Sequence, residues 1–130
     1  MPLPFSIVIP TYNEAAGIGK LLGALDGVFR ANSLDGEIIV VDDNSPDGTG
    51  AIVEGLSSTM PVRCLHRSGK LGLSSAVIDG WGVARSQSVA LGAMDADFSH
   101  DPNALPKMVA ALESGAYGLA VGSRYVAGGG

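Results

Sequence analysis

The sequence is poor in several residue types that would assign it quickly to a class of protein. It holds one cysteine in 130 residues, Cys64, so an internal disulfide is excluded and a reducing compartment fits. Aromatic residues make up 5%, and 8 Lys and Arg stand against 13 Asp and Glu. The resulting net charge of −5 disfavours a nucleic-acid-binding surface, because such surfaces carry clustered Lys and Arg.

Long apolar runs and the common dinucleotide motifs are also absent. The apolar stretches reach only strand length, whereas a membrane helix needs roughly 18 or more apolar residues. The start, MPLPFSIVIPTYNE, has no basic region and only a short apolar run, unlike a signal peptide. Neither GxGxxG nor a Walker A motif occurs. We therefore expect no membrane helix and no signal peptide in these residues, and dinucleotide binding has little support.

Strand-like and helix-like segments alternate along the chain. Apolar runs predict strands, and apolar residues at i, i+3, i+4 and i+7 predict helices. The expected strands are 5–9, 37–41, 62–65, 88–94 and 118–122, and the expected helices are 18–29, 49–57, 73–84 and 105–112. We expect Asp101 to cap the last helix. The alternation is typical of an α/β fold whose mainly parallel sheet carries helices on both faces.

A polar turn follows every expected strand. In chain order these turns read PTYNE, DDNSPDGT, HRSGKLG, DADFSHDP and SRY. The carboxyl ends of parallel strands lie at one edge of the sheet, and open α/β sheets bind their ligands there. One polar turn is ordinary, but five in succession predict a ligand site along this edge.

The DADFSHDP turn carries the clearest chemistry. Asp95 and Asp97 are separated by one residue, so their carboxylates can converge on one cation. Hard oxygen ligands without a His or Cys cluster suggest Mg²⁺ or Mn²⁺, shared with substrate phosphates. Ser99 and His100 can join the same site, although a capping or surface role for His100 is the more ordinary interpretation.

The turns after the first two strands offer contacts for a nucleotide. Asp42 or Asp43 can accept hydrogen bonds from a base or ribose. Tyr12 can stack on a base, and Glu14 can accept from sugar hydroxyls or mark the start of a helix. The stretch SPDGT also reads as a tight turn into a helix, with Asp47 or Thr49 as the cap of that helix, which is compatible with a functional acid before it.

Cations follow the third and fifth expected strands. Arg67, Lys70 and Arg124 suit the recognition of a diphosphate, although each can equally be a solvated surface charge. Trp81 and Cys64 are assigned to the core.

Two other α/β families share parts of this pattern. Receiver domains also carry VVDD at a strand end, and haloacid-dehalogenase-type phosphatases use DxDx[TS], which DADFS matches. In this chain VVDD follows the second strand, and no Lys-Pro follows the fifth. The DxDx[TS] motif normally follows the first strand, but here it follows the fourth. The order of the motifs therefore disfavours both families.

The motifs PTYNE, VVDDNSPDGT, RSGKLGL, MDADFSHDP and GSRY, in this order, resemble those of the inverting nucleotide-sugar glycosyltransferases of family 2, which have a GT-A fold. Within that family the similarity is greatest to dolichol-phosphate and polyprenol-phosphate mannosyltransferases, and it covers essentially the whole chain. The resemblance implies metal-dependent transfer of mannose or another hexose from a nucleotide-sugar, GDP-mannose by resemblance, to dolichyl or polyprenyl phosphate with inversion.

The resemblance also implies roles for individual residues. Those expected to bind the substrate are Pro10, Tyr12, Glu14, Asp42, Asp43, Lys70, Asp95 and Ala96. Asp43 would hold the base with Asp42 beside it, and Ala96 would line the ribose. Asp95, Asp97 and Ser99 would hold Mg²⁺ or Mn²⁺, although position 99 is Gln in some relatives. Asp97 and Arg124 would be catalytic, with Arg124 at the diphosphate or the acceptor phosphate.

Relatives in this family continue well beyond the fifth strand, whereas this sequence stops at VAGGG. We therefore expect residues 1–130 to be the nucleotide-sugar-binding portion of a truncated catalytic domain. Its partners would be a nucleotide-sugar and a polyprenyl or dolichyl phosphate at a membrane surface, without nucleic acid. The expected location is cytoplasmic, or the cytoplasmic face of a membrane through a missing C-terminal region or the lipid acceptor. The alternatives are a binding fragment without turnover and a family 2 transferase that uses UDP-glucose or a different acceptor.

Overall fold

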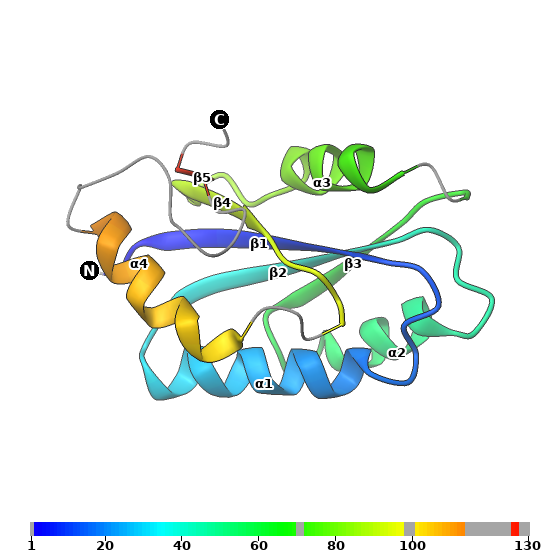
Figure 1. Ribbon diagram of the computed structural model, residues 1–130, viewed down its shortest axis with the longest axis horizontal. Coiled ribbons are helices and arrows are strands. Elements are labelled where there is room, and N and C mark those ends of the chain that lie inside the picture. The colour runs from blue at the N-terminus through cyan, green and yellow to red at the C-terminus, as the bar shows by residue number, and fades with distance from the viewer. Residues whose placement is uncertain (1, 70–71, 98–100, 114–125, 128–130) are drawn as a thin grey trace.

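The computed structural model of the protein describes residues 2–69, 72–97, 101–113 and 126–127, and it contains one sheet with helices on either side (Figure 1). In chain order its elements are β1 (Pro4–Thr11), α1 (Ile18–Ala31), β2 (Asp35–Asp42), α2 (Thr49–Leu56), β3 (Val62–His66), α3 (Leu73–Gly82), β4 (Ala90–Ala93), a 3₁₀ turn (Pro102–Ala104), α4 (Leu105–Glu113) and β5 (Val126–Ala127).

The strands are arranged in the order β3-β2-β1-β4-β5. The first four are parallel, and β5 pairs antiparallel with β4. The prediction of a mainly parallel sheet with helices on both faces is confirmed. The strand predicted at 118–122 lies outside the described residues, and the short antiparallel β5 was not predicted.

The two faces of the sheet are covered by different helices. In Figure 1, α1 and α2 lie on one side and α3 lies on the other. The strand side chains alternate accordingly: Ile7 and Ile9 of β1 belong to the large core that includes α1, whereas Val8 belongs to the smaller core under α3. All three are fully buried. Strands that are apolar on both faces explain the near-continuous apolar runs of the sequence.

Helix α3 approaches the sheet most closely at Gly80. A Cβ atom at this position would lie 2.6 and 2.7 Å from the methyl carbons of Val8, closer than packed atoms allow. Next to it, the indole nitrogen of Trp81 donates to the Gly92 carbonyl on β4 at 3.0 Å. Because Gly80 has no Cβ atom, α3 can pack this closely against the sheet.

The segment before α4 begins as predicted. The carboxylate of Asp101 accepts a hydrogen bond from the backbone amide of Asn103 at 2.9 Å, and Pro102 is the first residue of the 3₁₀ turn. Of the acids in MDADFSHDP, Asp101 therefore has the architectural role expected of a cap.

Candidate functional site

The turns that follow β1 and β2 are bonded to each other at the carboxyl edge of the sheet. Backbone amides of the first turn donate to side chains of the second in three hydrogen bonds: Asn13 to Ser45 Oγ at 2.9 Å, Glu14 to Thr49 Oγ1 at 3.0 Å and Ala15 to Asp47 Oδ2 at 3.0 Å. The motifs PTYNE and SPDGT therefore form one structural unit.

The helices that follow these turns are not capped as the sequence suggested. Helix α1 begins at Ile18, four residues after Glu14, whose backbone carbonyl accepts from the amides of Gly17 and Ile18. Helix α2 has Gly48 at its cap position, and Asp47 instead bonds the amide and hydroxyl of Thr49. The polar residues of SPDGT therefore join the two turns rather than cap α2 in the predicted way.

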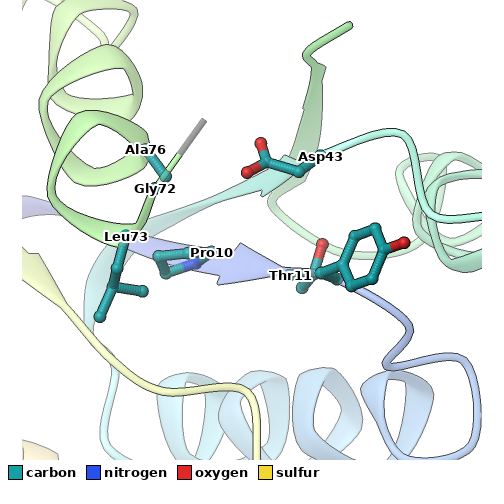
Figure 2. Close-up of a pocket in the computed structure, with 7 residues that line it drawn as sticks. Pro10, Thr11, Asp43, Gly72, Leu73 and Ala76 are labelled. Carbon is teal, nitrogen blue, oxygen red and sulfur yellow. The ribbon is translucent and has the colours of Figure 1, made fainter. Parts of the chain in front are cut away.

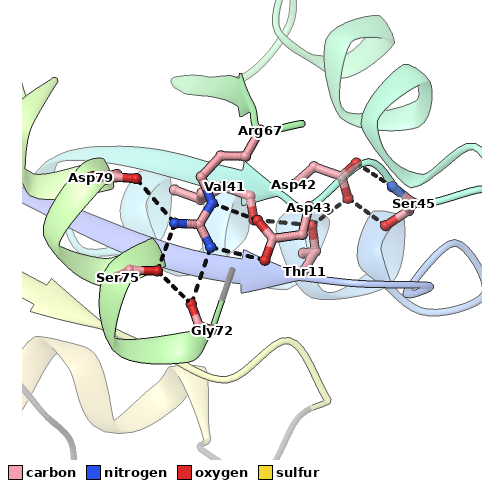
Figure 3. Close-up of polar contacts among 9 residues, drawn as sticks. All are labelled: Thr11, Val41, Asp42, Asp43, Ser45, Arg67, Gly72, Ser75 and Asp79. Carbon is pink, nitrogen blue, oxygen red and sulfur yellow. Dashed lines mark hydrogen bonds and ion pairs between the residues drawn. The ribbon is translucent and has the colours of Figure 1, made fainter. Parts of the chain in front are cut away.

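Asp42 is turned into the protein. It is 2% exposed, and its carboxylate accepts hydrogen bonds from Thr11 Oγ1 at 2.7 Å, Ser45 Oγ at 2.6 Å and the Ser45 amide at 3.0 Å (Figure 3). These bonds hold the end of β1 against the turn after β2. Asp42, which was expected to lie beside a base-binding Asp43, thus stabilises the turns around the candidate site.

Asp43 is paired with Arg67, the residue directly after β3 (Figure 3). The guanidinium donates from Nε to Oδ1 at 2.6 Å and from Nη2 to Oδ2 at 2.9 Å. Its Nη1 donates to Ser75 Oγ at 2.9 Å and Asp79 Oδ2 at 3.0 Å, and Nη2 also donates to the Gly72 carbonyl at 3.1 Å. The arginine therefore joins the ends of β2 and β3 to helix α3.

This geometry corrects the prediction that Arg67 is a cation for a diphosphate. Its side chain is 6% exposed, and the hydrogen bond to Asp43 raises the pKa of the guanidinium further, against the opposing effect of burial. The segment around Arg67 did not indicate the pairing, because its two acidic partners, Asp43 and Asp79, lie 24 and 12 residues away. The spacing of Ser75 and Asp79, four residues apart on one face of α3, was the available signal.

A pocket lies beside Asp43 (Figure 2). Its volume is about 150 Å³, and it is lined by Pro10, Thr11, Tyr12, Asp43, Gly72, Leu73 and Ala76. Pockets for a complete drug-sized ligand measure roughly 300–1,000 Å³, so this one suits a single part of a ligand. Pro10, Tyr12 and Asp43 are brought together as the sequence suggested, whereas Glu14 is not among the lining residues.

The DAD motif follows β4 at the same edge of the sheet. Asp95 is half-buried and Asp97 is exposed, whereas Ala96 between them is 8% exposed and belongs to the large core. The alanine therefore anchors the turn, and its two carboxylate neighbours lie nearer to solvent. Lys70, Ser99, His100 and Arg124 lie outside the described residues, so their expected roles stay predictions.

The architecture is that of an α/β protein, and its polar turns gather at the carboxyl ends of the parallel strands, where a ligand site was predicted. The sequence profile of "Glycosyl transferase family 2" matches residues 6–130. The chain belongs to this family.

Two curated relatives are similar over 95% of the chain, each at 43% identity. One is named dolichol-phosphate mannosyltransferase, from Pyrococcus furiosus, and the other polyprenol monophosphomannose synthase, from Mycolicibacterium smegmatis. The matched region is 34% of the first relative and 46% of the second. The chain therefore spans between a third and a half of the length of these proteins.

A solved structure shares the fold. The mannosyltransferase PcManGT from Pyrobaculum calidifontis, described in complex with GDP-Man and Mn²⁺, has a TM-score of 0.72 at 23% identity. The likeness covers 84% of this chain and 32% of that one.

In the part of the chain that the structure describes, no helix has the length and apolarity needed to cross a membrane.

Proposed function

We propose that this chain is the nucleotide-sugar-binding part of a metal-dependent glycosyltransferase. The donor would be GDP-mannose or a related nucleotide-sugar, and the acceptor a dolichyl or polyprenyl phosphate. Membership of family 2 and the names of the two relatives support the reaction class. One observation supports the proposal most: the pocket beside Asp43 and the Asp95–Asp97 pair lie at the same edge of the sheet. The pocket is at the end of β2, and the acid pair follows β4.

The pocket beside Asp43 fits the nucleoside end of the donor. Pro10 and Tyr12 offer flat apolar surfaces, and Asp43 offers a hydrogen-bond acceptor. Strand β1 lies between β2 and β4 in the sheet, so a bound nucleotide would extend across the end of β1 toward the DAD motif. In this arrangement the diphosphate and the sugar would reach Asp95 and Asp97.

The donor set of the DAD motif fits a hard divalent cation. Asp95 and Asp97 carry carboxylate oxygens, which are the ligands that Mg²⁺ and Mn²⁺ prefer. Among the described residues, no three His, Cys, Asp or Glu side chains form a group that could hold a metal ion. The protein would therefore supply part of the coordination and the diphosphate the rest, with Ser99 as a further proposed ligand. When bound, the ion would stabilise negative charge on the leaving diphosphate.

The chemistry requires no general base from the chain. A polyprenyl phosphate is already ionised at neutral pH, so its oxygen can attack the anomeric carbon directly. The bond from that carbon to the diphosphate breaks, and its electron pair leaves with the diphosphate. Attack from the opposite face inverts the anomeric centre. Arg124 and Lys70 are proposed to stabilise the phosphate charges.

The test is a calorimetric titration of residues 1–130 with GDP-mannose, UDP-glucose and the free nucleotides, with and without Mn²⁺. We expect metal-dependent binding that distinguishes among the nucleotides. Asp97→Ala should remove the metal-dependent part and leave the fold intact, because the residue is exposed. Binding that ignores the metal, or the absence of binding for every nucleotide, would refute the site assignment.

We further propose that residues 1–130 bind the donor without completing turnover, because the relatives are more than twice as long as the matched region. The corresponding assay offers GDP-mannose and a polyprenyl phosphate to this chain alone. Formation of a mannosyl phosphate lipid would contradict the proposal that residues 1–130 do not complete turnover.

A further inference from the structure

The acid in the pocket, Asp43, is held by an arginine that is itself held on its other side. Both oxygens of the carboxylate receive hydrogen bonds from the Arg67 guanidinium. The remaining edge of the guanidinium donates to Ser75 and Asp79 on α3, and a further bond reaches the Gly72 carbonyl. The side chains of Arg67 and Asp43 are only 6% and 9% exposed. These bonds hold the planar guanidinium of Arg67 in one orientation, and the guanidinium in turn fixes the plane of the Asp43 carboxylate.

The same arginine also positions a wall of the pocket. Gly72 lines the pocket and accepts a hydrogen bond from Arg67 through its carbonyl oxygen. Ser75, which precedes the lining residue Ala76, accepts a second bond. Arg67 thus contacts both Asp43, which follows β2, and residues at the start of α3, although it does not itself line the pocket (Figures 2 and 3).

This pairing determines what Asp43 can recognise. A carboxylate bonded to a permanently charged guanidinium stays ionised, so it can accept hydrogen bonds but cannot donate one. Guanine and uracil each present a ring N–H on their Watson–Crick edge, and this group can donate a hydrogen bond to a carboxylate. Adenine and cytosine present a ring nitrogen lone pair at the corresponding position, which a carboxylate repels.

We propose that Arg67 is a specificity-determining positioning residue, which holds Asp43 as a fixed, ionised acceptor that selects bases with a ring N–H, guanine or uracil, over adenine and cytosine. The inference rests on the proposed function, because it assumes that the Asp43 pocket takes the base of a nucleotide. It adds a role for a residue that does not itself touch the base.

The experiment measures the affinities of GDP, UDP, ADP and CDP for the 130-residue chain in the presence of Mn²⁺. The variants are Arg67→Lys, which keeps the charge but loses the fork, and Arg67→Gln. Arg30→Gln is the matched control, because Arg30 is an exposed arginine in an i,i+4 ion pair with Asp26 on α1. Circular dichroism and the thermal midpoint of every variant establish that it is folded.

The unmodified chain should prefer GDP or UDP over ADP and CDP. In Arg67→Lys the affinity for the preferred nucleotide should fall by about 10- to 100-fold, by analogy with lost supporting partners of metal ligands. The affinities for ADP and CDP should change much less, so the discrimination ratio falls. Arg30→Gln should keep both the affinity and the ratio. A residue that merely stabilises the fold would instead lower the thermal midpoint and leave the ratio unchanged.

The outcomes separate this inference from the proposed function. If the unmodified chain binds none of the four nucleotides, the proposed function fails. If it binds them with a base preference that folded Arg67→Lys retains, the role of Arg67 is overturned while the site stands. Binding without any base preference in the unmodified chain also overturns the role of Arg67. Should Arg67→Gln fail to fold, Arg67→Lys alone decides, because it keeps a cation beside the buried Asp43.

Discussion

Two buried carboxylates lie near opposite ends of β2, and both are paired with arginine. Asp43, just past the carboxyl end, is bonded by Arg67. Glu37, near the amino end, is 8% exposed and accepts from the Arg63 Nε at 2.8 Å, from the Arg85 amide at 3.1 Å and from Ser6 Oγ at 2.8 Å. The side-chain chemistry of the two clusters is almost the same.

Their surroundings differ. A hollow of about 290 Å³ also lies beside Glu37 and is larger than the pocket beside Asp43, so volume does not distinguish the two edges. Of the two edges, it is the carboxyl one that gathers the PTYNE, SPDGT and DAD turns. A buried acid–arginine pair therefore becomes a candidate binding group only where other ligand-binding groups converge on it.

The sharpest test of this contrast replaces each acid by its amide. Asp43→Asn should weaken the binding of the preferred nucleotide by about 10- to 100-fold, the usual value of a hydrogen bond to a charged group. Glu37→Gln should leave that affinity unchanged, because Glu37 lies at the opposite edge. Isothermal titration calorimetry with GDP and Mn²⁺ measures both. Equal losses in the two variants would remove the distinction between the clusters.

The second effect concerns stability. Glu37→Gln should lower the free energy of unfolding by about 1–3 kcal/mol, because the amide cannot satisfy all the donors that converge on the buried carboxylate. Urea denaturation measures the change, and an unchanged midpoint would mean that the cluster contributes little to the fold.

The strands and helices of the described residues were largely predictable, because they rest on local patterns. Apolar runs indicated strand positions, and Asp101 next to Pro102 indicated the start of the segment before α4. The local pattern did not separate the adjacent acids Asp42 and Asp43, and only the family resemblance assigned the base to Asp43. The backbone path after β2 decides that Asp42 bonds Thr11 and Asp43 bonds Arg67.

The misassignment of Arg67 has the same origin. A cation after a strand is equally compatible with a substrate phosphate and with an internal carboxylate. The choice depends on a contact with Asp43 that is remote in sequence. The antiparallel pairing of β5 is likewise a non-local property, and its two residues are too few to carry a pattern.

The third prediction concerns the helix that forms one wall of the Asp43 pocket. Gly80→Ala should destabilise the fold by about 1–3 kcal/mol, because the new methyl group would overlap buried Val8. Gly82→Ala is the control on the same helix: nothing lies within 4 Å of the position its methyl group would take, so it should be neutral or stabilising by up to about 1 kcal/mol. Thermal unfolding compares the two, and similar midpoints would contradict the close packing of α3.

The smallest expected effect is a pH dependence at the amino edge. Burial alone would raise the pKa of Glu37, but the hydrogen bonds from the Arg85 amide, Ser6 and Arg63 outweigh it and hold the pKa below the ordinary value of 4.5. Because the folded-state pKa is the lower one, the stabilisation is complete above the ordinary value and is lost as the pH falls through the folded-state pKa.

The difference in unfolding free energy between the unmodified chain and Glu37→Gln should therefore shrink on acidification below pH 4.5. Urea denaturation over a series of pH values measures it. A difference that stays constant through this range would show that the ionised form of Glu37 is not the stabilising one.

In the proposed function, Asp95 and Asp97 form one part of a metal site and the diphosphate of the substrate forms the other. Electron paramagnetic resonance of free Mn²⁺, titrated with the chain in the presence of GDP or guanosine, tests it most directly. We expect GDP to strengthen Mn²⁺ binding, guanosine to have no effect, and Asp97→Ala to abolish the strengthening. Equally tight Mn²⁺ binding with GDP and guanosine, or binding that survives in Asp97→Ala, would contradict it.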